Sequence, residues 1–174
     1  MQDRLAKAIQ LRETGRAKQD QTMLEEARTI LLELVAAYPD EAEITYQTAI
    51  VHDNLGLERE SIPFYIQTLT QGLSGPDTAT KLMKRERAFL GLGSTYRVLG
   101  EYQKAEETFR RGLKEFPHSR PLQTFLSLAL YNTQKHKEAM ELVLTNLLET
   151  TSDEALQYYK RGLLFYASHL DETW

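Results

Sequence analysis

The sequence predicts an all-α protein built from stacked helical hairpins. Apolar residues recur at helical spacing along most of the chain, and a pattern of small and large residues returns after 34 positions. The 174 residues include only 9 Gly and 5 Pro, too few for the many tight turns of an all-β fold. Hydrophobic residues make up 41% of the chain, which argues against intrinsic disorder. We therefore expect about four hairpins and one last helix, packed as a single domain.

The clearest hairpin is predicted over residues 78–117. Gly100 ends its first helix, because glycine readily takes the left-handed backbone found at helix C-termini. Pro117 ends the second helix, because proline disfavours helical backbone in the residue before it. The side chains expected on the buried faces are Phe89, Leu92, Tyr96 and Leu99 in the first helix, and Ala105, Phe109, Gly112, Leu113 and Phe116 in the second.

The same pattern places three more hairpins. A step of 34 residues forward predicts a hairpin over 120–150, and a step of 44 back predicts one over 42–73 that is followed by a ten-residue insertion. A further step of 34 back predicts a first hairpin over 2–39. Its fit is weaker, because Lys18 falls where the pattern needs a buried residue. We therefore expect this hairpin to have a long polar turn over 16–21.

A last helix is predicted over about 153–169, with Asp153 in the capping region. The side chains expected to cover the fourth hairpin are Leu156, Tyr159, Leu163, Tyr166 and Leu170. Tyr158 and Phe165 form a second apolar strip, which Trp174 follows. A capping helix needs a polar outer face, so these surplus aromatics indicate a self-association surface or a groove wall. The alternative is that they are scattered, partly exposed side chains.

The third hairpin resembles the tetratricopeptide repeat (TPR). The matching residues are Phe89, Leu92, Gly93, Tyr96, Ala105, Phe109, Gly112 and Pro117, with Phe89 where the pattern favours Trp and Gly112 where it favours Ala. The resemblance covers about residues 8–151, and the middle of the chain is also similar to a small bacterial group of short TPR proteins. It implies a right-handed α-α superhelix. In such a superhelix the first helix of each hairpin lines a concave surface that grips a peptide or a partner helix.

Position by position, the resemblance implies a ligand groove along the first helices. The residues selected for it are Tyr46, Ile50 and Asn54 in the second hairpin, Arg87 and Arg97 in the third, and Tyr131 and Asn132 in the fourth. The alternative is that these residues are ordinary solvated or partly packed side chains. The TPR clamp for C-terminal carboxylates uses lysines and asparagines at fixed groove positions. This chain has other residues there, for example Tyr46 and Ile50, so we do not expect it to bind the C-terminal tail of a chaperone. Arg87 and Arg97 remain able to bind a carboxylate or a phosphate.

The charge of the chain argues against a nucleic-acid partner. The net charge is −4, and residues 1–76 carry 7 basic and 12 acidic side chains. A basic run over 81–87 fits a helix whose charged residues are solvated and whose Leu82 continues the buried stripe. Aromatic residues do not alternate with these charges, as a platform for single-stranded nucleic acid requires. We therefore predict no nucleic-acid partner.

The sequence contains no recognisable set of catalytic or metal-binding residues. Cysteine is absent, and the four histidines have no metal-ligand spacing. His52 falls at a packing position and is expected in the interior. Glu106 and Glu107 are adjacent, so they do not face each other on a helix and are expected on the surface. We therefore predict a protein that is not an enzyme and uses no cofactor or metal, with a hydrolase or transferase as the least favoured reading.

Two hypotheses for function follow. The start of the chain has no apolar signal-peptide core, and its longest nearly apolar stretch, 30–37, is too short to span a bilayer, so we expect a cytoplasmic protein without a membrane partner. The leading hypothesis is a module that binds a protein or peptide in its concave groove. The second is a homodimer assembled through the aromatic last helix, with Tyr158, Phe165 and Trp174 at the interface.

Overall fold

The computed structural model describes residues 1–71 and 78–173, and every regular element within these ranges is an α-helix. The helices are α1 (Gln2–Lys18), α2 (Gln21–Ala37), α3 (Ala42–Asn54), α4 (Glu58–Gln71), α5 (Thr78–Val98), α6 (Tyr102–Glu115), α7 (Arg120–Asn132), α8 (His136–Thr150) and α9 (Glu154–Ser168). The insertion expected at 72–77 and Trp174 lie outside the described residues. The all-α fold class is confirmed.

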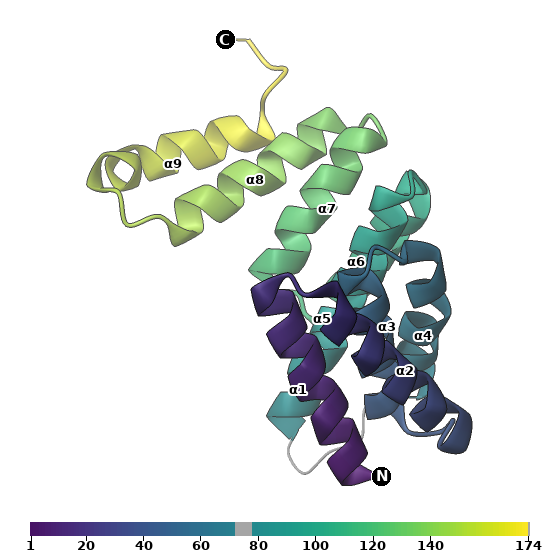
Figure 1. Ribbon diagram of the computed structural model, residues 1–174. Helices are drawn as coiled ribbons and strands as arrows, with labels where there is room; N and C mark the ends of the chain where they lie inside the picture. Colours follow the sequence, from purple (N-terminus) through teal and green to yellow (C-terminus); the bar gives the residue numbers. More distant parts are fainter. Residues whose placement is uncertain (72–77, 174) are drawn as a thin grey trace.

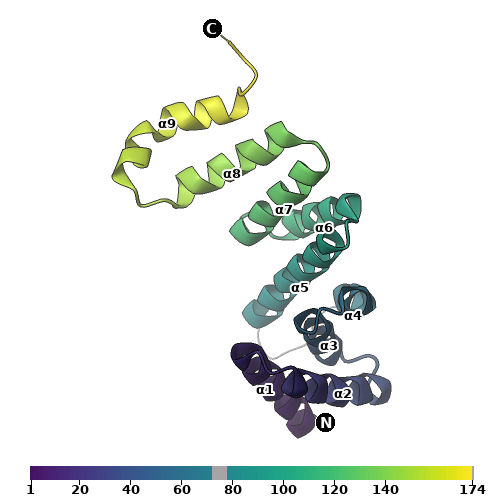
Figure 2. The same cartoon turned by 45° about the horizontal axis from the view of Figure 1, so that its top comes forward.

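The helices stack as a solenoid of hairpins (Figure 1). Each helix packs against the next one in the chain. The first helices of successive hairpins also contact one another, α1 with α3, α3 with α5 and α5 with α7. The last helix breaks this order, because among the described residues α9 contacts α8 but not α7 (Figure 2). Neighbouring hairpins therefore hold the fold together up to α8.

The buried apolar core forms two clusters along the solenoid. Its main part extends from α3 to α8 and includes Phe89 and Phe109, both with no exposed surface. A smaller part joins Leu31 of α2 to Val51 of α3. Burying one such side chain is worth about 1.5–3 kcal/mol relative to leaving it in water. Since α3 contributes to both parts, the first hairpin depends on the second for its core.

Small residues on the first helices let aromatic rings of the second helices approach the backbone. A Cβ atom added to Gly93 would lie 2.4 Å from the ring of Phe109, and one added to Gly91 would lie 2.3 Å from the ring of Tyr65. No real Cβ makes contacts this short, so α5 accepts glycine alone at these two positions without a shift of its neighbours.

The first hairpin has a tight turn, and the expected long polar turn is wrong. α1 continues to Lys18 and α2 begins at Gln21. Asp20 caps α2, since its carboxylate accepts a hydrogen bond from the backbone N–H of Met23 at 3.1 Å. Gly15 makes the close approach possible, because a Cβ there would lie 3.0 Å from the backbone oxygen of Asp20. Lys18 is exposed on the last turn of α1, where a cation is favourable.

Leu82 does not continue the buried stripe of α5, because 49% of its surface is exposed. α5 has 21 residues and α6 has 14, so the first turns of α5 extend past the helix that would cover them. Two cations of the basic run pair with other helices. Lys84 contacts Glu43 of α3 at 2.7 Å, and Arg85 contacts Glu115 of α6 at 2.5 Å.

Glu106 is buried, and its expected place on the surface is wrong. Only 6% of the residue is exposed. Its carboxylate accepts hydrogen bonds from Lys135 at 2.6 Å, Arg110 at 2.8 Å and Thr133 at 2.9 Å. Burial acts to raise the pKa of Glu106, but these three donors outweigh it and lower the pKa to about 2. Thr133 and Lys135 belong to the turn of the next hairpin, which the spacing of apolar residues in α6 does not reveal.

The contact between Gly93 and Phe109 should limit stability. Gly93→Ala should lower the free energy of unfolding by about 1–3 kcal/mol, because overpacking outweighs the roughly 1 kcal/mol gain in helix propensity. Gly162→Ala is the matched control, since a Cβ there meets no atom within 4 Å, and it should raise the free energy of unfolding by about 0.5–1 kcal/mol. Urea unfolding followed by circular dichroism measures both. Equal stability of the two variants would show that the ring contact imposes no constraint.

The ion pairs of Glu106 should make stability depend on acid pH. Its folded pKa of about 2 lies below the ordinary value of 4.5, so the stabilisation is complete above about pH 4.5 and is lost as the pH falls toward 2. Glu106→Gln should cost on the order of 2 kcal/mol at pH 7 and flatten the profile between these limits. Glu107→Gln, on the exposed neighbour, should change neither. Urea unfolding at pH 7, 5 and 3 tests this, and parallel profiles for wild type and Glu106→Gln would contradict it.

Candidate functional site

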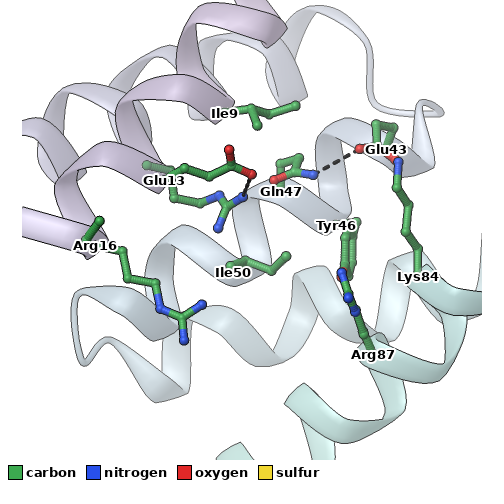
Figure 3. Close-up of a pocket in the computed structure, with 11 residues that line it drawn as sticks. Ile9, Glu13, Arg16, Glu43, Tyr46, Gln47, Ile50, Lys84 and Arg87 are labelled. Carbon is green, nitrogen blue, oxygen red and sulfur yellow. Dashed lines mark hydrogen bonds and ion pairs between the residues drawn. The ribbon is translucent and has the colours of Figure 1, made fainter. Parts of the chain in front are cut away.

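A pocket of about 810 Å³ opens where the first helices α1, α3 and α5 meet (Figure 3). Three of the predicted groove residues, Tyr46, Ile50 and Arg87, line it. Ile9 and Ile50 contribute apolar surface from α1 and α3. The cations and carboxylates around them come from all three helices, so the pocket exists only when the first three hairpins are stacked.

Arg12 of α1 lines the pocket and is almost completely buried. Only 7% of the residue is exposed, and one guanidinium nitrogen contacts the carboxylate of Glu13 at 3.1 Å. Its Nε atom is buried without a hydrogen-bond partner among the described residues. Burial lowers the pKa of Arg12, with Glu13 opposing the shift. A buried guanidinium with an unpaired N–H is costly to the fold, which marks it as a residue available to a ligand.

The α3 side of the pocket is polar and only partly paired. Glu43 accepts hydrogen bonds from the amide nitrogen of Gln47 at 2.9 Å and from Lys84 at 2.7 Å. The Oε1 atom of Gln47 is buried and has no partner among the described residues. Tyr46 is 4% exposed, and burial raises the pKa of its hydroxyl while Arg87 opposes the shift. The pocket therefore offers one unpaired acceptor on α3 beside the unpaired donor on α1.

Two further guanidinium groups reach the pocket from opposite sides. Arg16 extends from α1, and Arg87 extends from α5 and lies beside Tyr46 (Figure 3). Neither forms an ion pair within the part of the chain that the structure describes. With Arg12 and Lys84, the lining holds four cations but only two carboxylates. The pocket is therefore positively charged.

Sequence reasoning missed Arg12 and Arg16, although the repeat contained the signal. Stepping back 34 residues from Tyr46 and Ile50 leads to these two positions. Because the first hairpin fits the repeat weakly, the predicted groove began only at the second hairpin. In the structure both arginines line the same pocket as Tyr46 and Ile50.

The other predicted groove residues lie away from this pocket. Arg97 donates a hydrogen bond from Nε to the side-chain oxygen of Asn132 at 2.9 Å, which joins α5 to α7. Tyr131 is 63% exposed, with its ring 4.9 Å from that of His136. Asn54 lines a separate hollow of about 370 Å³, to which Arg16 also contributes. Arg97 and Asn132 thus form one group, and Tyr46, Ile50 and Arg87 another.

α9 packs through only part of the expected stripe, in which Leu156 and Leu163 are half-buried. Tyr159 and Tyr166, predicted to be covered, are 62% and 55% exposed, and Leu170 is 42% exposed. Ala167 is 1% exposed instead, because a small side chain lets the two helices approach and moves the large rings to the side. The remaining surplus aromatics, Tyr158 and Phe165, are 82% and 48% exposed.

The place where a further first helix would pack is uncovered. In the third hairpin Phe109 is fully buried and its ring contacts Phe125 of α7. Val143, 34 residues later, is 43% exposed, because α9 packs along α8 without touching α7 (Figure 2). The exposed apolar side chains at this end are Leu128 and Tyr131 on α7 and Met140, Val143 and Leu147 on α8. A second surface, apolar in character, therefore lies at the opposite end from the charged pocket.

His52 is an interior packing residue, as its position in the repeat predicts. It is 2% exposed, with Nδ1 2.7 Å from the backbone oxygen of Thr48 and Nε2 accepting a hydrogen bond from Arg28 at 3.2 Å. Burial lowers its pKa. Within the described ranges, no three His, Cys, Asp or Glu side chains gather as metal ligands, and no helix there has the length and apolar character needed to cross a membrane.

Comparison with known proteins agrees with the repeat. The model of the family described as tetratrico peptide repeat matches residues 42–170, the part that holds α3 to α9. Among solved structures, the chain is similar to the crystal structure of a thermophilic TPR protein in Thermus thermophilus, with 18% identity and a TM-score of 0.40 over 94% of this chain and 98% of that one. No curated protein matches. The chain belongs to the tetratricopeptide repeat family.

Proposed function

We propose that the chain acts in the cytoplasm as a single, non-enzymatic solenoid domain that binds a peptide segment or partner helix along its first helices. TPR proteins generally mediate contacts between proteins, which supports the class of function. The residues proposed to contact the partner are Tyr46, Ile50, Asn54, Arg87, Arg97, Tyr131 and Asn132.

The pocket between α1, α3 and α5 is the observation that carries this proposal. It has room for several side chains, at about 810 Å³, and it is lined by apolar, charged and amide groups together. Buried polar atoms in native proteins almost always have partners. Nε of Arg12 and Oε1 of Gln47 have none within the described chain, so both are free to pair with a bound segment.

Site-specific photocrosslinking in cells tests the groove. A benzoylphenylalanine at Ile50, inside the pocket, or at Tyr131, on α7, should give crosslinks to the same partner protein. The same group at Lys114, exposed on the second helix α6, should not. Crosslinks from Lys114 alone, or to different proteins from Ile50 and Tyr131, would contradict binding along the first helices.

A homodimer is the second candidate, and the uncovered end of the solenoid favours it. The exposed apolar side chains there are Leu128, Tyr131, Met140, Val143, Leu147, Tyr158, Tyr159, Phe165 and Tyr166. Packing α8 and α9 of a second copy against this end would cover the apolar area.

Light scattering over a range of protein concentrations tests the dimer. Wild type should pass from monomer to dimer in the micromolar range, and Val143→Glu should remain monomeric, because a buried unpaired carboxylate opposes the interface. Lys114→Glu, remote from this end, should dimerise as wild type does. A wild-type monomer at every concentration, or a dimer of Val143→Glu, would exclude this interface.

A further inference from the structure

We infer that the pocket between α1, α3 and α5 binds carboxylate side chains of an acidic partner segment. This inference rests on the proposed binding of a segment along the first helices and adds the chemistry that the segment must have.

The charges of the pocket require an anion. Glu13 pairs with Arg12 and Glu43 pairs with Lys84, so the two carboxylates of the lining are already used. The guanidinium groups of Arg16 and Arg87 face the same space from α1 and α5 without an ion pair among the described residues (Figure 3). A guanidinium group binds a carboxylate through two parallel hydrogen bonds. Two such groups can hold two carboxylates, or one from both sides.

The positive charge is local. Residues 1–76 carry 12 acidic and only 7 basic side chains, so the surrounding half of the chain is negative. Two of the four pocket cations, Lys84 and Arg87, are brought in by α5 from the second half. An acidic segment is therefore repelled by the rest of this half and attracted to the pocket, which favours one binding position over others.

The unpaired acceptor distinguishes a peptide from a simple anion. Oε1 of Gln47 is buried and needs a hydrogen-bond donor. A peptide backbone supplies an N–H beside each acidic side chain, whereas a phosphate ion offers mainly acceptors. Ile9 and Ile50 provide apolar surface for the methylene groups of such side chains. Donor, acceptor and apolar requirements are met together by glutamate or aspartate within a peptide.

A titration of the full chain tests this inference. The probe is a fluorescein-labelled tetraglutamate peptide with a C-terminal amide, so that only side-chain carboxylates are present, and tetraglutamine is its neutral control. Fluorescence anisotropy in 50 mM salt should show at least tenfold tighter binding of tetraglutamate. Arg16→Gln and Arg87→Gln should each weaken it at least fivefold. Arg161→Gln, an exposed arginine on α9, should change it by less than twofold.

Arg12→Met separates a binding role from a structural one. It should weaken tetraglutamate binding at least fivefold while leaving the melting temperature of the free protein unchanged or higher, because it removes a buried charge that is incompletely paired. A lower melting temperature with unchanged binding would assign Arg12 to the fold instead.

Three results would overturn the inference. Equal binding of tetraglutamine would show that carboxylates are not recognised. Equal weakening by Arg161→Gln would show a general charge effect, and complete competition by inorganic phosphate at the concentration of the peptide would show a simple anion site. Suppose that Ile50 gives crosslinks but the chain binds tetraglutamate no more tightly than tetraglutamine. Binding along the groove would then stand, and only the acidic ligand would be rejected.

Discussion

The fold depends on how closely the second helices approach the first helices, both within a hairpin (Phe109 on Gly93) and between hairpins (Tyr65 on Gly91). Tyr65 packs against Gly91, and Phe109 packs against Gly93, at distances that exclude even a methyl group. A helical hairpin cannot bury its own apolar face, so it needs contacts such as that of Tyr65 with Gly91, which joins the second hairpin to the third. The stacking that results also aligns α1, α3 and α5, whose exposed sides form the charged pocket. The close approach of helices in the core is therefore also needed to form the pocket.

Some charged residues form ion pairs that stabilise the stacked helices, whereas others have no carboxylate partner within the described chain. Glu106 binds three donors from α6 and the next turn, and Lys84 and Arg85 each bind a carboxylate on another helix. Arg16 and Arg87 have no carboxylate partner within the described chain. Because buried or half-buried ion pairs gain from a low local dielectric, the paired residues stabilise specific contacts. The two arginines without a carboxylate give the pocket its charge.

The two ends of the solenoid differ in chemistry. The first three hairpins form a charged, partly apolar hollow, whereas α7, α8 and α9 expose aliphatic and aromatic side chains. Val143 replaces Phe109 at the equivalent position, and α9 lies along α8 alone, so the stack ends with its next contact surface uncovered. The residues that line the charged pocket are therefore different from the exposed apolar residues at the other end.

The sequence by itself determined the helices, the repeat and the small and large residues that meet where two helices cross closely, because these follow from spacing along one chain. It also indicated that Tyr46, Ile50 and Arg87 share a face. Only the tertiary structure decided that Arg12 and Glu106 are buried, that Tyr159 and Tyr166 are exposed and that the first turn is tight. Burial at a helix end or on an outer face depends on which neighbour packs there and at what angle, and that information is absent from the periodicity of the helix itself.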